Sequence, residues 1–226
     1  HAPIIIFIHD KEWEMARMTD KIRVAVAGAS GKMGREVVKM VLEEPSFELA
    51  AAVGRSTAGR DAGEAAGLPA CCVTITDDLE AALHGGAVDV LVDFTVPQSA
   101  YDNTKTAITY GVRPVVGTTG FTPEQIDELD KLCESRGIGG LIAPNFSIGA
   151  ILMMKFAAEA ARYFPHLEII EYHGDRKLDA PSGTSIKTAE LISAVRGELR
   201  QGHPDEEEKL QGSRGGYYNG FRIHSV

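Results

Sequence analysis

The sequence predicts an α/β fold whose first part is a parallel sheet flanked by helices. An apolar segment at residues 22–27 leads into a glycine-rich turn and an amphipathic helical pattern. Apolar segments and helical patterns then alternate as far as residue 143, and polar residues directly follow most of the apolar segments. Strand–helix repeats of this kind form parallel sheets that bind ligands beyond the carboxyl ends of their strands.

The first strand–helix unit has the features of a dinucleotide-binding turn. The strand at 22–27 is followed by Gly28-Ala29-Ser30-Gly31-Lys32-Met33-Gly34. One helical face then carries Met33, Val37, Val38 and Val41, before Pro45. The N-terminus of such a helix offers free N–H groups to a pyrophosphate. The spacing is G-x-x-G-x-x-G, not the commoner G-x-G-x-x-G, so a tight turn without a ligand is the alternative.

The end of the second strand favours a phosphorylated cofactor. This strand, at 47–53, ends in Gly54-Arg55-Ser56. Many NAD-binding folds have an acidic residue here that holds the ribose 2′-hydroxyl. Arg55 can instead pair with a 2′-phosphate, and Ser56 can add a donor. The sequence therefore leans toward NADPH, with an ordinary surface arginine as the alternative.

Three later strand ends carry further candidate ligand-binding residues. Strands are predicted at 87–95, 113–116 and 138–143, and helices begin near Pro97 and at Thr122-Pro123. The residues at the strand ends are Phe94 and Thr95, then Gly117, Thr118, Thr119 and Gly120, then Pro144, Asn145 and Phe146. Taken singly, each is also an ordinary turn residue.

The segment from Glu171 to Thr184 predicts a site for a small carboxylate. His173 and Lys177 stand four residues apart, and Pro181-Ser182-Gly183-Thr184 then opens a helix. Imidazole can transfer a proton near neutral pH, lysine offers a point charge, and the helix N-terminus offers N–H groups. The helical face that follows carries Ile186, Ala189, Ile192, Val195 and Leu199. The alternative is a surface loop with solvated His and Lys side chains.

Composition and charge are those of an ordinary globular enzyme. Of 226 residues, 44% are hydrophobic and 24% are charged, which allows one large or two modest domains. The net charge of −9 argues against broad binding to nucleic acid or anionic membrane. Cys71, Cys72 and Cys133 have neither disulfide-framework nor metal-site spacing, so no metal is expected. No segment is long enough to span a membrane, and we expect a cytoplasmic protein.

Residues 1–20 are expected to lie outside the fold as an N-terminal extension. The apolar run at 4–8 is short and lacks the basic flank of a signal peptide. Met18-Thr19-Asp20, immediately before the first strand, would be a natural start. We interpret residues 1–17 as an upstream extension or an expression remnant.

With these motifs in view, the sequence resembles the dihydrodipicolinate reductase family. The resemblance covers roughly residues 21–226, in the family's order, through segments 28–34, 93–95, 117–121, 145–149 and 168–184. The last of these, Glu-x-x-Glu-x-His-x-x-x-Lys-x-Asp-x-Pro-Ser-Gly-Thr, is highly specific. The resemblance implies a Rossmann-like dinucleotide domain at 21–147 and a smaller α+β substrate domain with a mixed sheet at 148–226, in a homotetramer.

The resemblance also implies the reaction: NADPH or NADH reduces 4-hydroxy-tetrahydrodipicolinate, a cyclic unsaturated dicarboxylate, to tetrahydrodipicolinate in diaminopimelate and lysine biosynthesis. His173 is the expected proton donor, and Lys177 a further donor to a carboxylate or the ring nitrogen. Besides Lys177, the expected substrate-binding residues are Ser182, Gly183 and Thr184. The expected cofactor-binding residues are Gly28, Ala29, Ser30, Gly31, Lys32, Met33, Arg55, Gly117, Thr118, Thr119, Ala143, Pro144, Asn145 and Phe146.

Two departures from the family pattern leave alternatives open. Many members carry a second His where this chain has Gly174, so one contact is either missing or supplied elsewhere, for example by Arg176. The family's chain also continues beyond Val226, and we interpret the C-terminal end as truncated. The other interpretations are a different Rossmann-type dehydrogenase for an amino acid or semialdehyde, and a non-catalytic nucleotide-binding protein.

Overall fold

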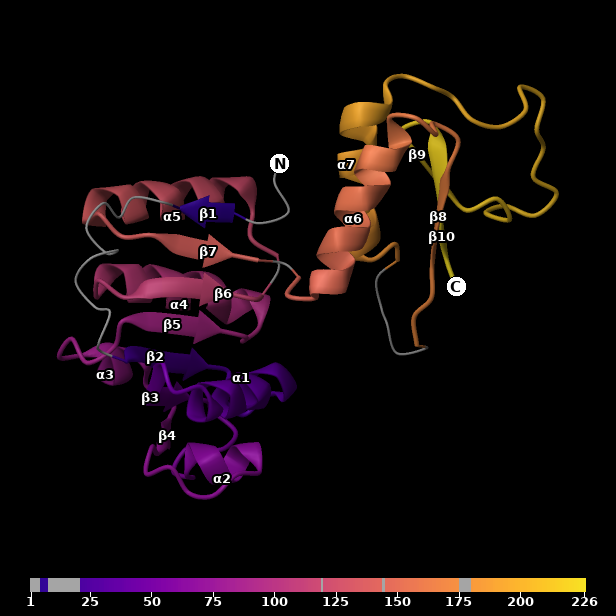
Figure 1. Cartoon of the computed structure of the whole chain (residues 1–226). Helices are drawn as coiled ribbons and strands as arrows, with labels where there is room; N and C mark the ends of the chain where they lie inside the picture. Colours follow the sequence, from indigo (N-terminus) through magenta and orange to yellow (C-terminus); the bar gives the residue numbers. More distant parts are fainter. Residues whose placement is uncertain (1–4, 8–20, 119, 144, 175–179) are drawn as a thin grey trace. The chain divides into compact units, whose positions relative to one another are not determined.

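The computed structural model describes residues 5–7, 21–118, 120–143, 145–174 and 180–226. The chain divides into two compact units, residues 1–144 and 145–226 (Figure 1). This division falls slightly before the domain boundary expected from the sequence. Each unit has a sheet and a hydrophobic core of its own.

The first unit is built on a sheet with the strand order β1-β7-β6-β5-β2-β3-β4. Its strands are β1 (Ile5–Phe7), β2 (Ile22–Ala27), β3 (Phe47–Val53), β4 (Ile75–Thr76), β5 (Val90–Asp93), β6 (Arg113–Val116) and β7 (Gly140–Ile142). Its helices are α1 (Lys32–Glu43), α2 (Ala62–Ala66), α3 (Leu79–Leu83), α4 (Pro97–Thr109) and α5 (Pro123–Arg136). Strands β2 to β7 pair in parallel, which confirms the predicted α/β class.

The N-terminal segment differs from the sequence prediction. Ile5–Phe7, within the expected extension, pairs antiparallel with β7, placing Ile6 opposite Leu141. The physical reason lies in β7, which would otherwise form the edge of the sheet. The free N–H and C=O groups of an edge strand readily pair with a short apolar segment of high strand propensity.

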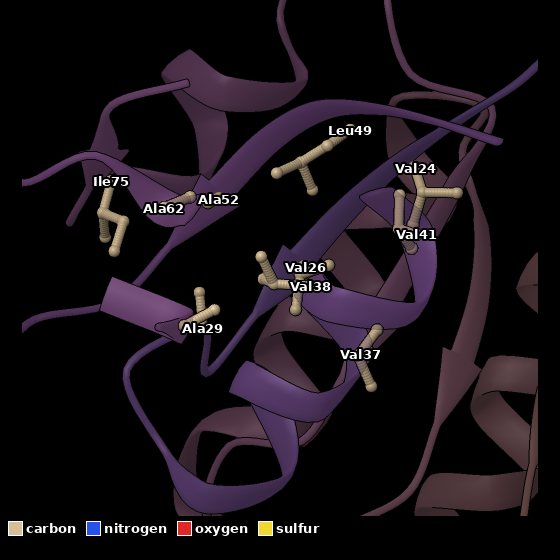
Figure 2. Packing of buried hydrophobic residues seen from close by; sticks show 11 residues of the cluster. Val24, Val26, Ala29, Val37, Val38, Val41, Leu49, Ala52, Ala62 and Ile75 are labelled. Atoms are coloured by element: carbon tan, nitrogen blue, oxygen red, sulfur yellow. The ribbon is translucent and has the colours of Figure 1, made fainter. Parts of the chain in front are cut away.

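Strand β2 supplies side chains to both faces of the first sheet. Val24 and Val26 pack against Val38 of α1 on one face (Figure 2), whereas Ala25 and Ala27 belong to a separate cluster on the other face. A strand covered by helices on both faces is expected to be almost entirely apolar, and β2 is apolar except for Arg23 near its start. Met33, expected on the buried face of α1, is instead exposed, whereas the next residue, Gly34, is buried against the backbone of the Gly28 turn.

The second unit packs two helices on a small mixed sheet. Its elements are α6 (Ile148–Ala161), β8 (Glu168–Glu171), α7 (Gly183–Arg196), β9 (Gly216–Tyr218) and β10 (Phe221–Ser225). The central strand β10 is parallel to β8 and antiparallel to β9, which confirms the expected mixed sheet. Ala189 and Ile192 of α7 join the core as predicted. The helix ends at Arg196, before Leu199, because Gly197 follows with a φ of +74°.

A buried arginine ties the end of α7 to the sheet. Arg196 is only 8% exposed, and its guanidinium donates to the carbonyl oxygens of Pro165, Asn219 and Gly220 and to the side chain of Gln201. It also lies over the Phe221 ring, 5.3 Å from the centroid. Arginine suits this position because its five donors form a rigid planar fork.

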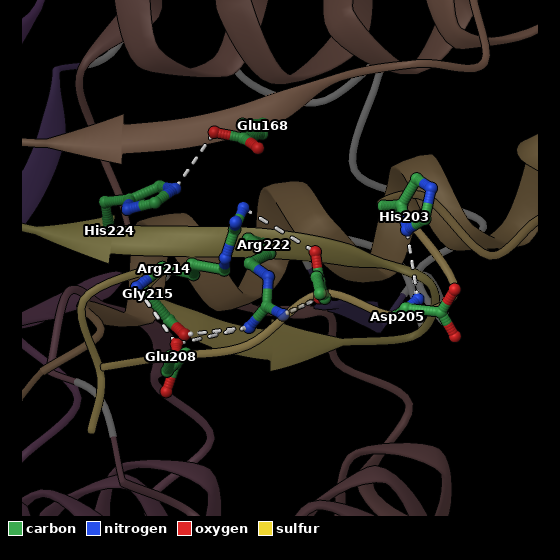
Figure 3. A network of polar contacts seen from close by, with 9 residues as sticks. Glu168, His203, Asp205, Glu208, Arg214, Gly215, Arg222 and His224 are labelled. Carbon is green, nitrogen blue, oxygen red and sulfur yellow. Dashed lines mark hydrogen bonds and ion pairs between the residues drawn. The ribbon is translucent and has the colours of Figure 1, made fainter. Parts of the chain in front are cut away.

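The long segment between α7 and β9 is held by ion pairs to strand β10 (Figure 3). Arg222 of β10 pairs with Glu206 and donates to the Gly215 carbonyl oxygen at 3.3 Å. Glu208 accepts from the backbone N–H groups of Gly212 and Arg214. Thus the segment follows a defined path although it contains no helix or strand between residues 197 and 215.

Candidate active site

The first unit contains a cavity at the carboxyl ends of β2, β3, β4 and β5. Its volume is about 440 Å³. Four of the expected cofactor-binding residues line it: Gly28, Ser30, Gly31 and Arg55. Of the other expected residues in this region, Ala29 is buried in the core, and Lys32 and Met33 are exposed on the first turn of α1. Thr119 lies outside the described residues.

The glycine turn brings backbone, rather than side chains, up to this cavity. Gly28 has a φ of +80°, and a Cβ at this position would lie 2.7 Å from the Phe94 carbonyl oxygen. A Cβ on Gly34 would lie 2.0 Å from the Gly28 carbonyl oxygen. Gly31 caps α1 without any side-chain hydrogen bond. The first N–H groups of α1 therefore remain available to an anion.

A glycine, Gly54, stands where many dinucleotide-binding folds have an acidic residue. A Cβ on Gly54 would lie 2.4 Å from Ser30 Oγ, and Ser30 Oγ shares a hydrogen bond with Thr57 Oγ1. A side chain at position 54 would therefore require Ser30 to move. Arg55, the next residue, lines the cavity and makes no hydrogen bond or ion pair with any described residue.

A buried carboxylate fixes the opposite wall of the cavity. Asp93, at the end of β5, is fully buried and accepts hydrogen bonds from Thr95 N at 2.8 Å, Thr95 Oγ1 at 2.6 Å and Asn103 Nδ2 at 2.8 Å. Thr118 Oγ1 donates to the Thr95 carbonyl oxygen at 3.0 Å. Thr95 and Asn103 line the cavity, so Asp93 holds their polar groups in position. Gly117 donates its backbone N–H to the Asp93 carbonyl oxygen at 2.9 Å.

The second unit contains a larger cavity, of about 730 Å³, among α6, α7 and β8. His173, Ser182 and Thr184 all line it, as does Asn145. The expected grouping of His173 with the Ser-Gly-Thr turn is therefore present in one cavity. Gly183 is the first residue of α7. Lys177 and Arg176 lie outside the described residues.

The residues expected after β7 fall in different surroundings. Ala143 is buried at the end of β7, and Pro144 lies outside the described residues. Asn145 belongs to the second unit, where its Nδ2 donates to Thr184 Oγ1 at 3.4 Å and its Oδ1 accepts from Ser147 N at 2.8 Å. Phe146 is exposed. In this unit Asn145 therefore orders the start of α6 and contacts the Ser-Gly-Thr turn.

Glu171 is the anchor of the second cavity, a role that the sequence motif did not reveal. Its carboxylate accepts from Ser182 N at 2.8 Å, from Ser182 Oγ, and from Ser185 Oγ and Ser225 Oγ, each at 2.6 Å. Burial raises the pKa of Glu171, but these hydrogen bonds outweigh burial and lower the pKa to about 2 from an ordinary 4.5. One carboxylate thus joins β8, β10 and the start of α7.

The same carboxylate lies beside the imidazole. His173 Nδ1 is 3.8 Å from Glu171 Oε2, and the His173 backbone N–H donates to the Val226 carbonyl oxygen at 3.0 Å. The His173 side chain is 41% exposed, so it remains accessible from the cavity. A general acid needs both this access and a fixed orientation. The sequence offered one signal for Glu171: an acidic residue at the end of a strand, two positions before His173.

Among the described residues, no three or more His, Cys, Asp or Glu side chains lie close enough together to hold a metal ion. Over the same residues, no helix is both long enough and apolar enough to cross a membrane.

Two family models match the chain. Residues 22–146 match the model of the dihydrodipicolinate reductase N-terminus, and residues 149–226 match that of the dihydrodipicolinate reductase C-terminus. Together the two matches span nearly all of the chain after the N-terminal segment.

Individual relatives agree with the family models. The chain is 55% identical over 205 residues to the 4-hydroxy-tetrahydrodipicolinate reductase of Halalkalibacterium halodurans, covering 91% of this chain and 78% of that protein. It is 52% identical to that of Geobacillus kaustophilus, covering 91% and 77%. The structure of dipicolinate-bound dihydrodipicolinate reductase from Paenisporosarcina sp. TG-14 is similar, with a TM-score of 0.77, 47% identity, and coverage of 91% of this chain and 78% of that one.

Replacing Glu171 with Gln tests its anchoring role through pH. Because the folded pKa is about 2 against 4.5, the carboxylate contributes its full stability above pH 4.5 and loses it as the pH falls toward 2. A shift of this size corresponds to about 3 kcal/mol. We expect Glu171→Gln to lower the free energy of unfolding at pH 7 by up to that amount, and by less at pH 3.

Urea denaturation at the two pH values measures this difference. Glu168→Gln is the matched control, because Glu168 stands on the same strand but is exposed, and it should change stability by less than about 1 kcal/mol. An equal loss for Glu171→Gln at pH 7 and pH 3 would contradict the role of the ionised carboxylate.

Proposed function

The chain belongs to the dihydrodipicolinate reductase family, and we infer that it is an oxidoreductase that reduces 4-hydroxy-tetrahydrodipicolinate to tetrahydrodipicolinate with a pyridine nucleotide, as a cytoplasmic step of diaminopimelate and lysine biosynthesis. Overall, one hydride and one proton are added and the 4-hydroxyl group leaves as water. The observation that carries the chemistry is the grouping of His173, Ser182 and Thr184 in one cavity.

The cofactor site is proposed to lie in the first unit. The backbone of the Gly28 turn is too crowded for a side chain at that position. The first N–H groups of α1 have no side-chain cap, so both features suit a pyrophosphate. Thr95 and Thr118 would border the nicotinamide half of the cofactor. The bound cofactor would supply the hydride from its nicotinamide ring. The expected contacts from Thr119 and Pro144 belong to this proposal as well.

The second unit is proposed to bind the dicarboxylate and deliver the proton. His173 protonates the substrate as negative charge develops on reduction, and the Glu171 carboxylate lies 3.8 Å from its Nδ1. Lys177 holds a carboxylate or the ring nitrogen. The other substrate carboxylate binds at the N-terminus of α7, where Ser182, Gly183 and Thr184 offer N–H and hydroxyl groups. Dipicolinate, a planar cyclic dicarboxylate, is the ligand of the similar Paenisporosarcina structure, which supports this substrate class.

The activity is tested by following absorbance of the reduced nicotinamide with and without the cyclic imine substrate. We expect oxidation only when that substrate is present. His173→Ala should lower turnover by ~10²–10⁴-fold, the usual contribution of a general acid, without weakening cofactor binding. Lys177→Ala should lower turnover and weaken substrate capture together.

His166→Ala is the control for the loss of an imidazole, because His166 lines the same cavity but has no proposed part in proton transfer. It should keep near-native turnover. If His173→Ala and Lys177→Ala also keep near-native turnover, the proposed mechanism is wrong.

Arg55 supports the use of NADPH at least as well as NADH. A charge-assisted contact to a 2′-phosphate contributes about 1.5–3 kcal/mol, so Arg55→Ala should weaken NADPH by about ten- to a hundredfold relative to NADH. The measurement is the KM of each nucleotide. Arg60→Ala, a nearby exposed arginine that does not line the cavity, should leave both values unchanged. Equal losses for the two nucleotides in Arg55→Ala would refute the assignment.

We also propose that the chain forms a homotetramer through its second unit. Ile170, Tyr172 and Tyr217, on or next to strands β8 and β9, are large apolar side chains that are more than half exposed. Monomeric proteins rarely gather such residues on one sheet. Light scattering should give the mass of four chains in solution, and a mass of one chain would contradict the proposal.

A further inference from the structure

The cofactor cavity contains an unpaired carboxylate at the end of β4, the strand next to the one that precedes Arg55. Asp77 directly follows β4 and lines the same cavity as Arg55. We propose that Asp77 recognises the adenine base of the cofactor by accepting a hydrogen bond from its 6-amino group. This inference rests on the proposed use of a pyridine dinucleotide and deepens it, because it names the base as well as the phosphate.

The backbone places Asp77 beside Arg55. Val53 of β3 pairs with Thr76 of β4, and the Gly54 N–H donates to the Thr76 carbonyl oxygen at 2.8 Å. The chain then turns, because Thr76 Oγ1 accepts from Asp78 N at 3.1 Å. Arg55 and Asp77 therefore leave adjacent strands, spaced about 4.8 Å apart, at the same edge of the sheet.

The order of the strands sets the order of the cofactor's parts. The pyrophosphate belongs at the glycine turn after β2, and the adenosine ribose with its 2′-position belongs at the end of β3. The base is attached to that ribose on the side away from the pyrophosphate. It therefore lies further along the same line, which runs from the end of β2 past the end of β3. The next strand in the sheet is β4. The adenine consequently falls at Asp77, with Leu79, which also lines the cavity, as an apolar surface for its ring.

Asp77 has no other structural task within the part of the chain that the structure describes. It makes no hydrogen bond or ion pair there. Its neighbour Asp78, in contrast, caps α3 by accepting from Ala81 N at 2.9 Å. Asp77 is exposed and lines the cavity, so its carboxylate is accessible to a bound ligand. An ionised carboxylate only accepts hydrogen bonds, which matches the exocyclic amine of adenine.

The same property predicts discrimination against hypoxanthine. In that base a carbonyl oxygen replaces the 6-amino group, so two acceptors would face each other. Asn at position 77 can turn either its N–H₂ or its oxygen toward the base and should accept both. The quantity to compare is thus the ratio of the affinities for the adenine and the hypoxanthine nucleotides. A substitution that changes the charge of the cavity or the folding of the chain affects both affinities equally, so it leaves this ratio unchanged.

The experiment is calorimetric titration of the full chain, without substrate, with NADPH and with its nicotinamide hypoxanthine analogue. For the unmodified chain we expect NADPH to bind about tenfold more tightly, the equivalent of one hydrogen bond to a charged group. Asp77→Asn should bring the ratio of dissociation constants close to one. Asp78→Asn is the matched control and should keep the original ratio.

An unmodified chain that binds both nucleotides equally would overturn the inference, as would an unchanged ratio in Asp77→Asn or a lost ratio in Asp78→Asn. A separate turnover assay with the cyclic imine distinguishes this failure from failure of the proposed function. Turnover with no base preference refutes only the role of Asp77. Base-selective binding with no turnover refutes only the proposed reaction.

Discussion

The close approach of the Gly28 backbone to the Phe94 carbonyl oxygen is the contact on which the first unit depends. It requires a residue without a side chain at position 28, and a second one at position 34 so that α1 can approach the turn. The Phe94–Thr95 segment is fixed in turn by the buried Asp93 carboxylate. Together these contacts fix the ends of β2 and β5 and leave the N–H groups of α1 facing the cavity. The proposed pyrophosphate site is consequently a product of backbone packing more than of any charged side chain.

The second unit uses the same physical device at its own cavity. Glu171, like Asp93, is a buried carboxylate whose hydrogen-bond donors are neutral hydroxyl, amide or backbone groups. Such donors satisfy the carboxylate oxygens without placing a lysine or arginine beside them. In this way the Ser182 turn is held in place, while the positive end of α7 remains available to the carboxylate of the proposed substrate. Each site therefore relies on a satisfied anion outside the reacting groups to hold their geometry.

Packing also decides which side chains stand where the ribose and the base of the cofactor are proposed to bind. A Cβ at position 54 would lie 2.4 Å from Ser30 Oγ, so Ser30 packs directly against the glycine that ends β3, where the chain has no carboxylate. Arg55 is free to meet a phosphate there, and the nearest acid is displaced by one strand, to Asp77. In the proposed binding mode, this arrangement places Arg55 at the 2′-phosphate and Asp77 at the base.

Local sequence determined the elements whose signals are local. The glycine turn, the helix starts at Thr122 and Ser182, and most of the apolar faces of α1 and α7 depend on residues within a few positions of one another. The structure confirms these elements, with Met33 and Leu199 as the exceptions on the two faces. The specific string from Glu168 to Thr184 also determined the family. What tertiary structure alone decided involves partners far apart in the chain: Glu171 with Ser225, Arg55 beside Asp77, and the pairing of Ile5–Phe7 with β7. These contacts depend on which strand lies next to which, and no local pattern encodes that order.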